Sequence, residues 1–164
     1  MDAREERIRT VPVDAELAVH ERRWDDLLVS TDPSRLDLDT VHGFLSRSYW
    51  AAGIPRDVVD RSIRHSICFA AYVDGTQVGF ARVISDRATF AYLSDVFVIE
   101  SVRGRGVGKR LMECIMEHPA LQGLRLWTLF TRDAHGLYHH YGFREAKHPE
   151  RLMEIRAAHP YPGL

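Results

Sequence analysis

The stretch "DVFVIESVRGRGVGKRLMECIMEH", residues 95–118, decides the fold of this chain. An apolar run ends near Ile99, three glycines then alternate with Arg105 and Val107, and apolar residues recur at helical spacing as far as the stretch extends. Such a strand–loop–helix lets bare backbone amides approach a ligand at a helix N-terminus, where the dipole favours negative charge. With the basic residues of 103–110 around it, the loop predicts a pyrophosphate site. An ordinary strand-to-helix turn with solvated basic side chains is the alternative.

Two other phosphate-binding patterns fail at this loop. A Walker-type loop could end at Gly108-Lys109, but its first glycine would fall on Arg103 and its hydroxyl position on Arg110. The dinucleotide pattern Gly-x-Gly-x-x-Gly fails as well, because neither register places a third glycine. A nucleotide-phosphate protein is therefore disfavoured.

The elements around the loop predict a mixed α/β domain. Two β-rich runs meet at Asp74-Gly75, a strong hairpin signal, and a third run follows. Residues 1–24 are predicted to be a loose N-terminal lead-in, and 25–164 a single domain. The expected strands are 25–30, 67–85 as a hairpin, 88–100, 124–131 as a buried central strand, and a final pair at 142–147 and 151–157. The expected helices are 39–51, 56–66, 107–118 and 132–141. Asp39 or Thr40 is the expected N-cap of the first helix.

Composition narrows the function classes. The formal net charge of −1 argues against a broad nucleic-acid surface, so no nucleic-acid partner is expected. No apolar run approaches the roughly 20 residues that span a membrane, and the charged N-terminus does not resemble a secretory signal. Cys68 and Cys114 lie within apolar patterns and are interpreted as buried, reduced thiols. The sequence therefore predicts a cytoplasmic protein without a membrane partner.

Two motifs now resemble one known family. Arg103-x-x-Gly106-x-Gly108 resembles the pyrophosphate signature of the GNAT superfamily of N-acetyltransferases, and "LSDVFVIESV" before it resembles that family's fourth strand. "DAHGLYHHYGF", residues 133–143, resembles the family's A-x-x-L-Y-x-x-x-G-F element. The likeness covers roughly 67–156 and suggests a bacterial-type member. It implies an α/β (α+β) fold with a mixed sheet of about six to seven strands, flanking helices, and splayed fourth and fifth strands at 92–99 and 124–130.

The resemblance also implies acetyl-CoA as co-substrate, without a metal. The backbone of Phe97 and Val98 would pair with the pantetheine arm, and the Val98 N–H would polarise the thioester carbonyl. Thr131 stands where the family often has asparagine, so it would either bond to the pantetheine arm or cap the following helix. The candidate cofactor-binding residues are Phe97, Val98, Arg103, Gly104, Arg105, Gly106, Val107, Gly108, Lys109 and Thr131.

The same resemblance implies direct transfer to an amine. Tyr138 matches the family's acid tyrosine, which would protonate the departing thiolate, and Tyr141 is its backup. Asp95 is the candidate base or water-orienting group, because a carboxylate is costly within an apolar run and a functional role would explain its presence there. Tyr92 and Ser94 are the other candidates for the position on this strand that faces inward. A structural hydrogen-bonding role is the alternative for Asp95.

Some expectations concern partners and metals. His135 and His139 have the spacing of zinc ligands, but the sequence offers no third ligand nearby, so no metal is predicted. The acceptor is expected to be a small-molecule amine or a peptide, with Tyr49 and Trp50 as weak candidates for its pocket. Many members of the family are dimers, which leaves a homodimer as one option. A catalytically silent acyl-CoA-binding module is the alternative function.

Overall fold

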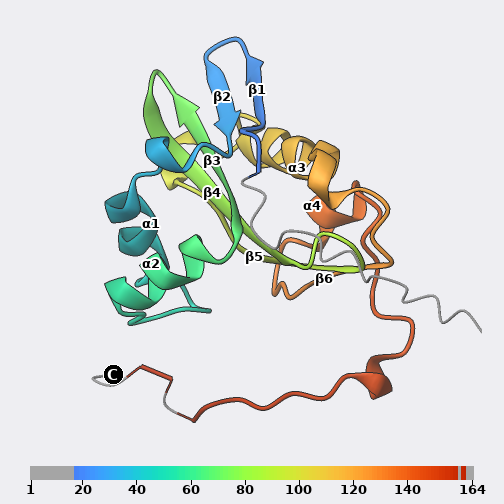
Figure 1. Ribbon diagram of the computed structural model, residues 1–164. Helices are drawn as coiled ribbons and strands as arrows, with labels where there is room; N and C mark the ends of the chain where they lie inside the picture. Colours follow the sequence, from blue (N-terminus) through green and yellow to red (C-terminus); the bar gives the residue numbers. More distant parts are fainter. Residues whose placement is uncertain (1–16, 159, 162–164) are drawn as a thin grey trace, which may run out of the picture.

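The computed structural model describes residues 17–158, 160 and 161, and a six-stranded sheet forms its centre (Figure 1). The strands lie in sequence order, and each neighbouring pair is antiparallel except the last, which is parallel. The parallel pair needs a crossover, which the third helix supplies. The strands are β1 Glu21–Trp24, β2 Leu27–Ser30, β3 Ile67–Val73, β4 Thr76–Ser85, β5 Phe90–Val98 and β6 Leu126–Leu129.

Helices cover both faces of the sheet. The helices are α1 Leu38–Leu45, α2 Arg56–Arg64, α3 Val107–Glu117 and α4 His135–His139. Figure 1 shows α1 and α2 on one face and α3 and α4 on the other. Side chains alternate across a strand, so successive residues of β4 serve different layers: Phe80 packs into the cluster with α1 and α2, while Ala81 packs into the cluster with α3. The predicted mixed α/β architecture is confirmed.

The central hairpin follows the predicted turn. Asp74 and Gly75 join β3 to β4 with φ of +48° and +78°, the left-handed pair that a two-residue hairpin requires. The predicted helices at 56–66 and 107–118 are also present, each shorter by a residue or two at its end. Local turn and helix signals were therefore sufficient in the middle of the chain.

Four sequence predictions need correction. Residues 21–24, assigned to a loose lead-in, form β1, while 1–16 lie outside the described residues. The first helix ends at Leu45, and its N-cap is Asp37, whose carboxylate accepts from the amides of Asp39 and Thr40 at 2.9 and 3.1 Å. The predicted strand pair at 142–147 and 151–157 does not form a ladder in the described chain, because neither segment has a hydrogen-bonded neighbour. Consequently β6 is an edge strand, and its Trp127 is only partly buried.

The sheet opens between β5 and β6. Their pairing ends at Leu93 opposite Leu129, although β5 continues to Val98. A β-bulge contributes to the opening: Phe80 pairs with Phe97 but Arg82 with Ser94, and Asp95 takes a left-handed φ of +55°. The splayed strands expected from the resemblance are thus confirmed, and the wedge between them is the natural place for a ligand.

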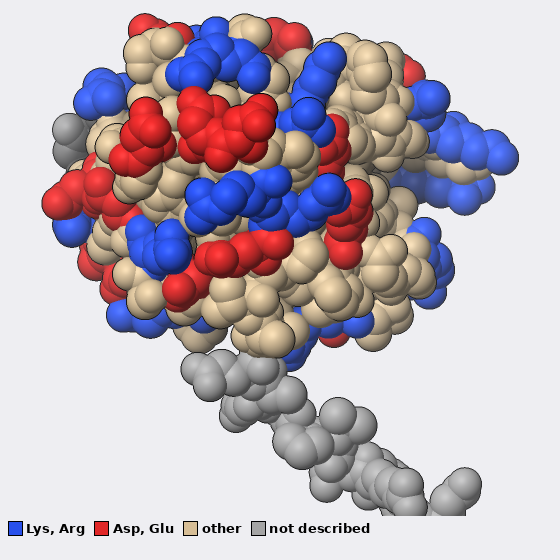
Figure 2. All heavy atoms as spheres, turned by 90° about the horizontal axis from the view of Figure 1, so that it is seen from above, with Lys and Arg blue, Asp and Glu red and all other residues tan. Residues whose placement is uncertain are grey.

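Charges of both signs share the surface. Figure 2 shows Lys and Arg side chains interspersed with Asp and Glu on the face seen from above. Several of them pair; for example, Arg22 pairs with Glu117, and Arg110 lies 2.8 Å from Glu113. Within the described part of the chain, no helix combines the length and the apolar character needed to cross a bilayer.

Candidate active site

The glycine loop brings free amides to the mouth of the wedge. Gly104 and Gly106 have φ of +79° and +81°, a region that residues with a side chain rarely adopt. A β-carbon at either position would meet nothing within 4 Å, so backbone conformation rather than space requires glycine here. Helix α3 begins directly afterwards, and its N-cap, Gly106, offers no side chain to bond to the first amides. The N–H groups of its first turn, 107–109, therefore remain available to an anion.

The end of β5 presents Val98 to the wedge. The Ile99 N–H donates to the Val78 carbonyl of β4 at 2.9 Å, and alternate residues of a strand direct their polar groups to opposite sides. The polar groups of Val98 therefore face away from β4. Its carbonyl accepts a 3.0 Å bond from Nε of Arg103, so this arginine secures the loop to the end of β5. The N–H of Val98 faces the same side.

A cavity of about 730 Å³ joins these groups. Most of the sequence-predicted site lines it: Phe97, Val98, Arg103, Gly104, Gly106, Val107, Gly108, Lys109 and Tyr138. Arg105 does not, because its guanidinium turns to Asp26 at 2.9 Å. Asp95 and Thr131 line a second cavity instead. Sequence reasoning missed Phe44 of α1, whose ring stacks on Phe97 with centroids 3.9 Å apart.

The second cavity, of about 490 Å³, continues from the first. Tyr138 lines both cavities and therefore stands at their junction. Tyr49 also lines both cavities, and Arg132 holds it in two ways. The Arg132 guanidinium lies 3.9 Å from the centre of the Tyr49 ring, and the backbone N–H of Arg132 donates to the Tyr49 hydroxyl at 3.3 Å. Aromatic side chains form much of the wall: Tyr49, Trp50, Tyr92 and Phe130.

Tyr138 is held protonated at the junction. Its side chain is buried, and burial, with smaller effects of Tyr49 and Asp133, raises its pKa to about 12. A phenol with this pKa keeps its proton at any physiological pH. The hydroxyl is thus able to donate to a group that becomes negatively charged beside it.

Asp95 is held by two donors. Its Oδ2 accepts from Nε of Arg82 at 2.8 Å and its Oδ1 from Nε1 of Trp50 at 3.2 Å. The two charged side chains are only 9% and 14% exposed, and the guanidinium also reaches the Ser66 and Ser94 hydroxyls. Sequence reasoning missed Arg82 as the partner, although a lone arginine within the apolar run "GFARVIS" was the available signal. These contacts fix both carboxylate oxygens in place as hydrogen-bond acceptors.

Two other predicted residues have structural contacts. Oγ1 of Thr131 accepts from the Ala134 amide at 3.0 Å, so it caps the turn before α4, one of the two roles expected for it. The Tyr141 hydroxyl donates to the Lys109 carbonyl at 2.9 Å and ties the end of α4 to the first turn of α3. That contact favours Tyr138 over Tyr141 as the acid.

Neither thiol is activated. Burial raises the pKa of both Cys68 and Cys114 to about 12, which keeps them as protonated, weakly nucleophilic thiols. His139 lies 3.2 Å from Glu145. No cluster of three His, Cys, Asp or Glu side chains within the described ranges could hold a metal ion.

Comparison with known proteins agrees with this geometry. A family model described as "Acetyltransferase (GNAT) domain" matches residues 64–145. The chain belongs to the GNAT acetyltransferase family. A relative from Gibberella zeae, which is named as an acetyltransferase, is 36% identical over 136 residues, covering 69% of this chain and 76% of its own.

Solved structures show the same GNAT fold. A Xanthomonas campestris structure described as a GNAT-family acetyltransferase is 54% identical, covers 84% of this chain and 97% of its own, and superposes with a TM-score of 0.81. The Escherichia coli ribosomal-protein-S18-alanine N-acetyltransferase is 20% identical over 73% of this chain and 79% of its own, with a TM-score of 0.60. At that identity, the second likeness supports the fold alone.

Proposed function

We propose that this GNAT acetyltransferase moves an acetyl group from acetyl-CoA directly to a primary amine. The observation that carries the proposal is the wedge between β5 and β6, with unpaired helix amides at one end and a protonated tyrosine in its middle. Its first cavity is lined by Arg103, Lys109 and the glycine loop, which suit an anionic ligand.

Donor binding follows from the loop and the end of β5. The amides of 107–109 and the Lys109 side chain would hold the pyrophosphate, and the polar groups of Val98 would pair with the pantetheine arm. The backbone of Phe97, which was also expected to pair with this arm, faces β4. Arg103 would act through the Val98 carbonyl that it holds. This arrangement would bring the thioester to Tyr138, which lines the same cavity.

The reaction requires two proton transfers. A lysine-like amine has a pKa of about 10.4 and must lose a proton before its lone pair attacks the thioester carbonyl. The Val98 N–H would stabilise the negative charge that develops on the carbonyl oxygen. As the C–S bond breaks, the Tyr138 hydroxyl would supply a proton to the sulfur. Direct transfer accords with thiols that stay protonated.

Asp95 would orient water rather than act as the base itself. Both carboxylate oxygens already accept bonds, from Arg82 and Trp50, but a carboxylate oxygen can accept a second bond, and Asp95 lines the second cavity. A water bonded there would carry the amine proton away. The acceptor, a small-molecule amine or a peptide, would lie against the aromatic wall of this cavity. The cytoplasm, inferred from the sequence, is the proposed compartment.

Two measurements test the proposal. Calorimetry should detect acetyl-CoA binding, with ATP at the same concentration giving no heat. A panel of amines, amino acids and short peptides mixed with acetyl-CoA should then release free thiol in an acceptor-dependent way. Binding without thiol release for any acceptor would favour a silent acyl-CoA-binding module, and no binding at all would refute the donor assignment.

A further inference from the structure

Aromatic side chains gather in two pairs around the second cavity. Tyr49 and Trp50 come from the segment between α1 and α2, and their rings meet edge-on with centroids 5.0 Å apart. Tyr92 of β5 and Phe130, directly after β6, form another edge-on pair with centroids 5.9 Å apart. Edge-on contacts are a preferred geometry of aromatic pairs. Two separate parts of the fold therefore border one cavity with rings.

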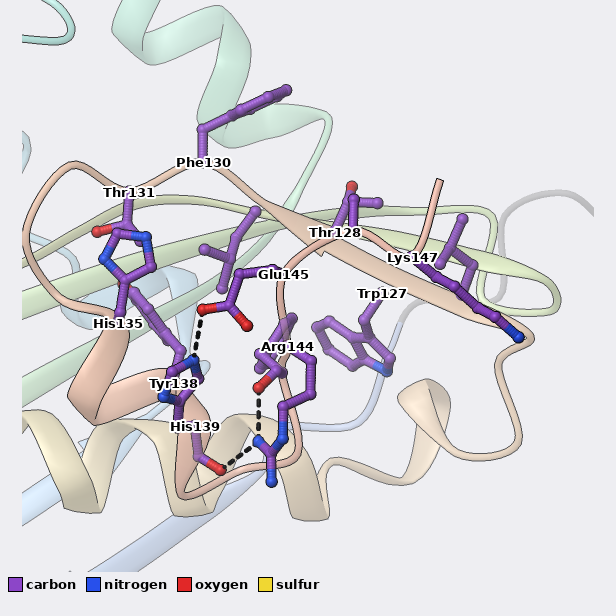
Figure 3. Close-up of a pocket in the computed structure, with 14 residues that line it drawn as sticks. Trp127, Thr128, Phe130, Thr131, His135, Tyr138, His139, Arg144, Glu145 and Lys147 are labelled. Atoms are coloured by element: carbon purple, nitrogen blue, oxygen red, sulfur yellow. Dashed lines mark hydrogen bonds and ion pairs between the residues drawn. The ribbon is translucent and has the colours of Figure 1, made fainter. Parts of the chain in front are cut away.

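Three of these rings are not used by the core. Phe130, Tyr49 and Trp50 are 62%, 52% and 41% exposed. Figure 3 shows Phe130 on the side of β6 opposite to Trp127, pointing away from α4. Single exposed apolar side chains are common on protein surfaces, but several large ones that line one cavity are typical of a site for an apolar ligand.

The two ring pairs share one side of the sheet. Tyr92 lies opposite Ile84 in the ladder, and Ile84 is four residues from Phe80, which packs into the cluster with α1 and α2. Alternate residues of a strand face the same way, so Tyr92 lies on the α1 and α2 side. Trp50, which follows α1, reaches β5 through the bond from its Nε1 to Asp95. A flat group in the cavity can therefore touch rings of both pairs.

The charged side chains of this cavity are already paired. Each has a partner of opposite charge: Asp95 with Arg82, Arg132 with Asp133, and Arg156 with Glu154. A second ammonium or a carboxylate on the ligand would lose its water there without gaining a free counter-ion. The cavity therefore disfavours polyamines, and it equally disfavours amines that carry a carboxylate.

The rings are also poorly arranged to hold a cation. Aromatic faces can bind an ammonium group, but the Arg132 guanidinium already lies 3.9 Å from the centre of the Tyr49 ring. A ligand cation beside it would meet a like charge. The contact that the remaining ring surfaces favour is with another ring.

We propose that the acceptor is a monoamine whose nitrogen is joined by a short arm to a flat aromatic ring, an inference that rests on the proposed transfer reaction. The ring would lie against Tyr92 and Phe130. Tyr49, Trp50 and Tyr138 line both cavities, so the arm would lead past them to the junction where the thioester is expected. The aromatic wall thus selects the body of the acceptor, and the junction selects its amine.

A series of amines tests the ring, its aromaticity and the charge. The reference is 2-phenylethylamine, compared with propylamine, which lacks the ring, 2-cyclohexylethylamine, whose ring is saturated, and spermidine and phenylalanine, which add charges. At saturating acetyl-CoA, kcat/KM from thiol release should favour 2-phenylethylamine by about tenfold or more over propylamine, spermidine and phenylalanine, and by about twofold or more over the saturated amine. A smaller preference over any of the four would overturn the proposal.

A pair of variants ties the preference to the aromatic wall. Phe130→Ala should lower the ratio of kcat/KM for 2-phenylethylamine to that for propylamine by about fivefold or more. The matched control is Leu126→Ala, which removes a 51% exposed side chain from the same strand but outside the residues that line the second cavity, and should leave the ratio unchanged. Both side chains are exposed, so circular dichroism should show an unaltered fold in both variants. Equal ratios in the two variants would refute the role of the wall.

Binding without turnover separates this inference from the transfer reaction. With coenzyme A present, saturation-transfer NMR should detect the ring protons of 2-phenylethylamine on the wild type and only weakly on Phe130→Ala. That result without thiol release from any amine would refute the transfer but keep the class of ligand. Thiol release that prefers amines without a ring would refute the class of ligand but keep the transfer. A wild-type protein that gives no ring signal would also overturn the inference.

Discussion

The two walls of the wedge are built in different ways. β5 is a nine-residue strand paired with β4 over most of its length, and it runs directly into the glycine loop and α3. β6 has four residues, one partner strand and an open edge. The second cavity, which Tyr138 of the short helix after β6 also lines, is formed by distant segments that include Tyr49, Asp95 and Arg156. Asp95 is in turn paired with Arg82 of β4. The proposed donor side is therefore a continuous piece of sequence, whereas the proposed acceptor side is assembled by the tertiary fold.

The largest effect is expected on the β6 side, at Tyr138. Tyr138→Phe removes the proposed proton donor but keeps the buried ring, so kcat should fall by about 10²–10⁴-fold. The acetyl-CoA Kd should change less than about twofold, because the hydroxyl serves the leaving group rather than ground-state binding. Steady-state thiol release and calorimetry measure the two quantities.

The pH profile of the wild-type enzyme also tests the role of Tyr138 as proton donor. The active form of Tyr138 is protonated, and a pKa of about 12 preserves it at every lower pH. Activity should rise with pH as the amine acceptor loses its proton, with no loss at the alkaline side below about pH 10. An alkaline fall near pH 8 that disappears in Tyr138→Phe would contradict this assignment.

The junction of the two walls should be sensitive to Asp95. Asp95→Asn leaves the nearly buried Arg82 without its counter-ion, so the free energy of unfolding should drop by about 3 kcal/mol. The matched control is Asp60→Asn, which breaks an exposed pair with Arg64 on α2 and should cost less than about 1 kcal/mol. Urea unfolding measures both, and equal losses would show that burial at Asp95 does not matter.

On the β5 side, the loop should respond through backbone conformation. Gly106→Ala forces a side chain into the left-handed region at a cost of about 1–2 kcal/mol, which should weaken acetyl-CoA binding by about 5–30-fold. Gly43→Ala makes the same chemical change within α1, where nothing lies within 4 Å and φ is ordinary, and should leave binding unaltered. Calorimetry compares them; equal affinities in the two variants would refute the amide site.

The smallest effect is expected at the cysteines. Cys68→Ala and Cys114→Ala should each keep the rate constant for transfer within about twofold, because protonated thiols are poor nucleophiles. A covalent acetyl-enzyme trapped by rapid quenching and mass spectrometry, absent in one of these variants, would replace direct transfer with a two-step route.

Sequence patterns predicted the fold well where neighbours along the chain are also neighbours in space. The turn at Asp74-Gly75 and the crossover from β5 through α3 were predicted correctly. Predictions were wrong at the two ends, where β1 replaced a lead-in and the expected final strands lack a ladder. A strand exists only through a partner, and no pattern within 151–157 says which edge it will meet.

The sequence by itself determined the proposed donor side: glycines at 104 and 106 permit the left-handed backbone angles of the loop that leads into the free amides of α3. Only the tertiary structure decided the state of the reactive groups. The left-handed Asp95 and the register shift beside it bring Arg82 onto the carboxylate, and burial of Tyr138 on α4 raises the pKa of its hydroxyl to about 12. Conformational preference is a property of a few consecutive residues, whereas ion pairing and burial depend on which distant segments meet.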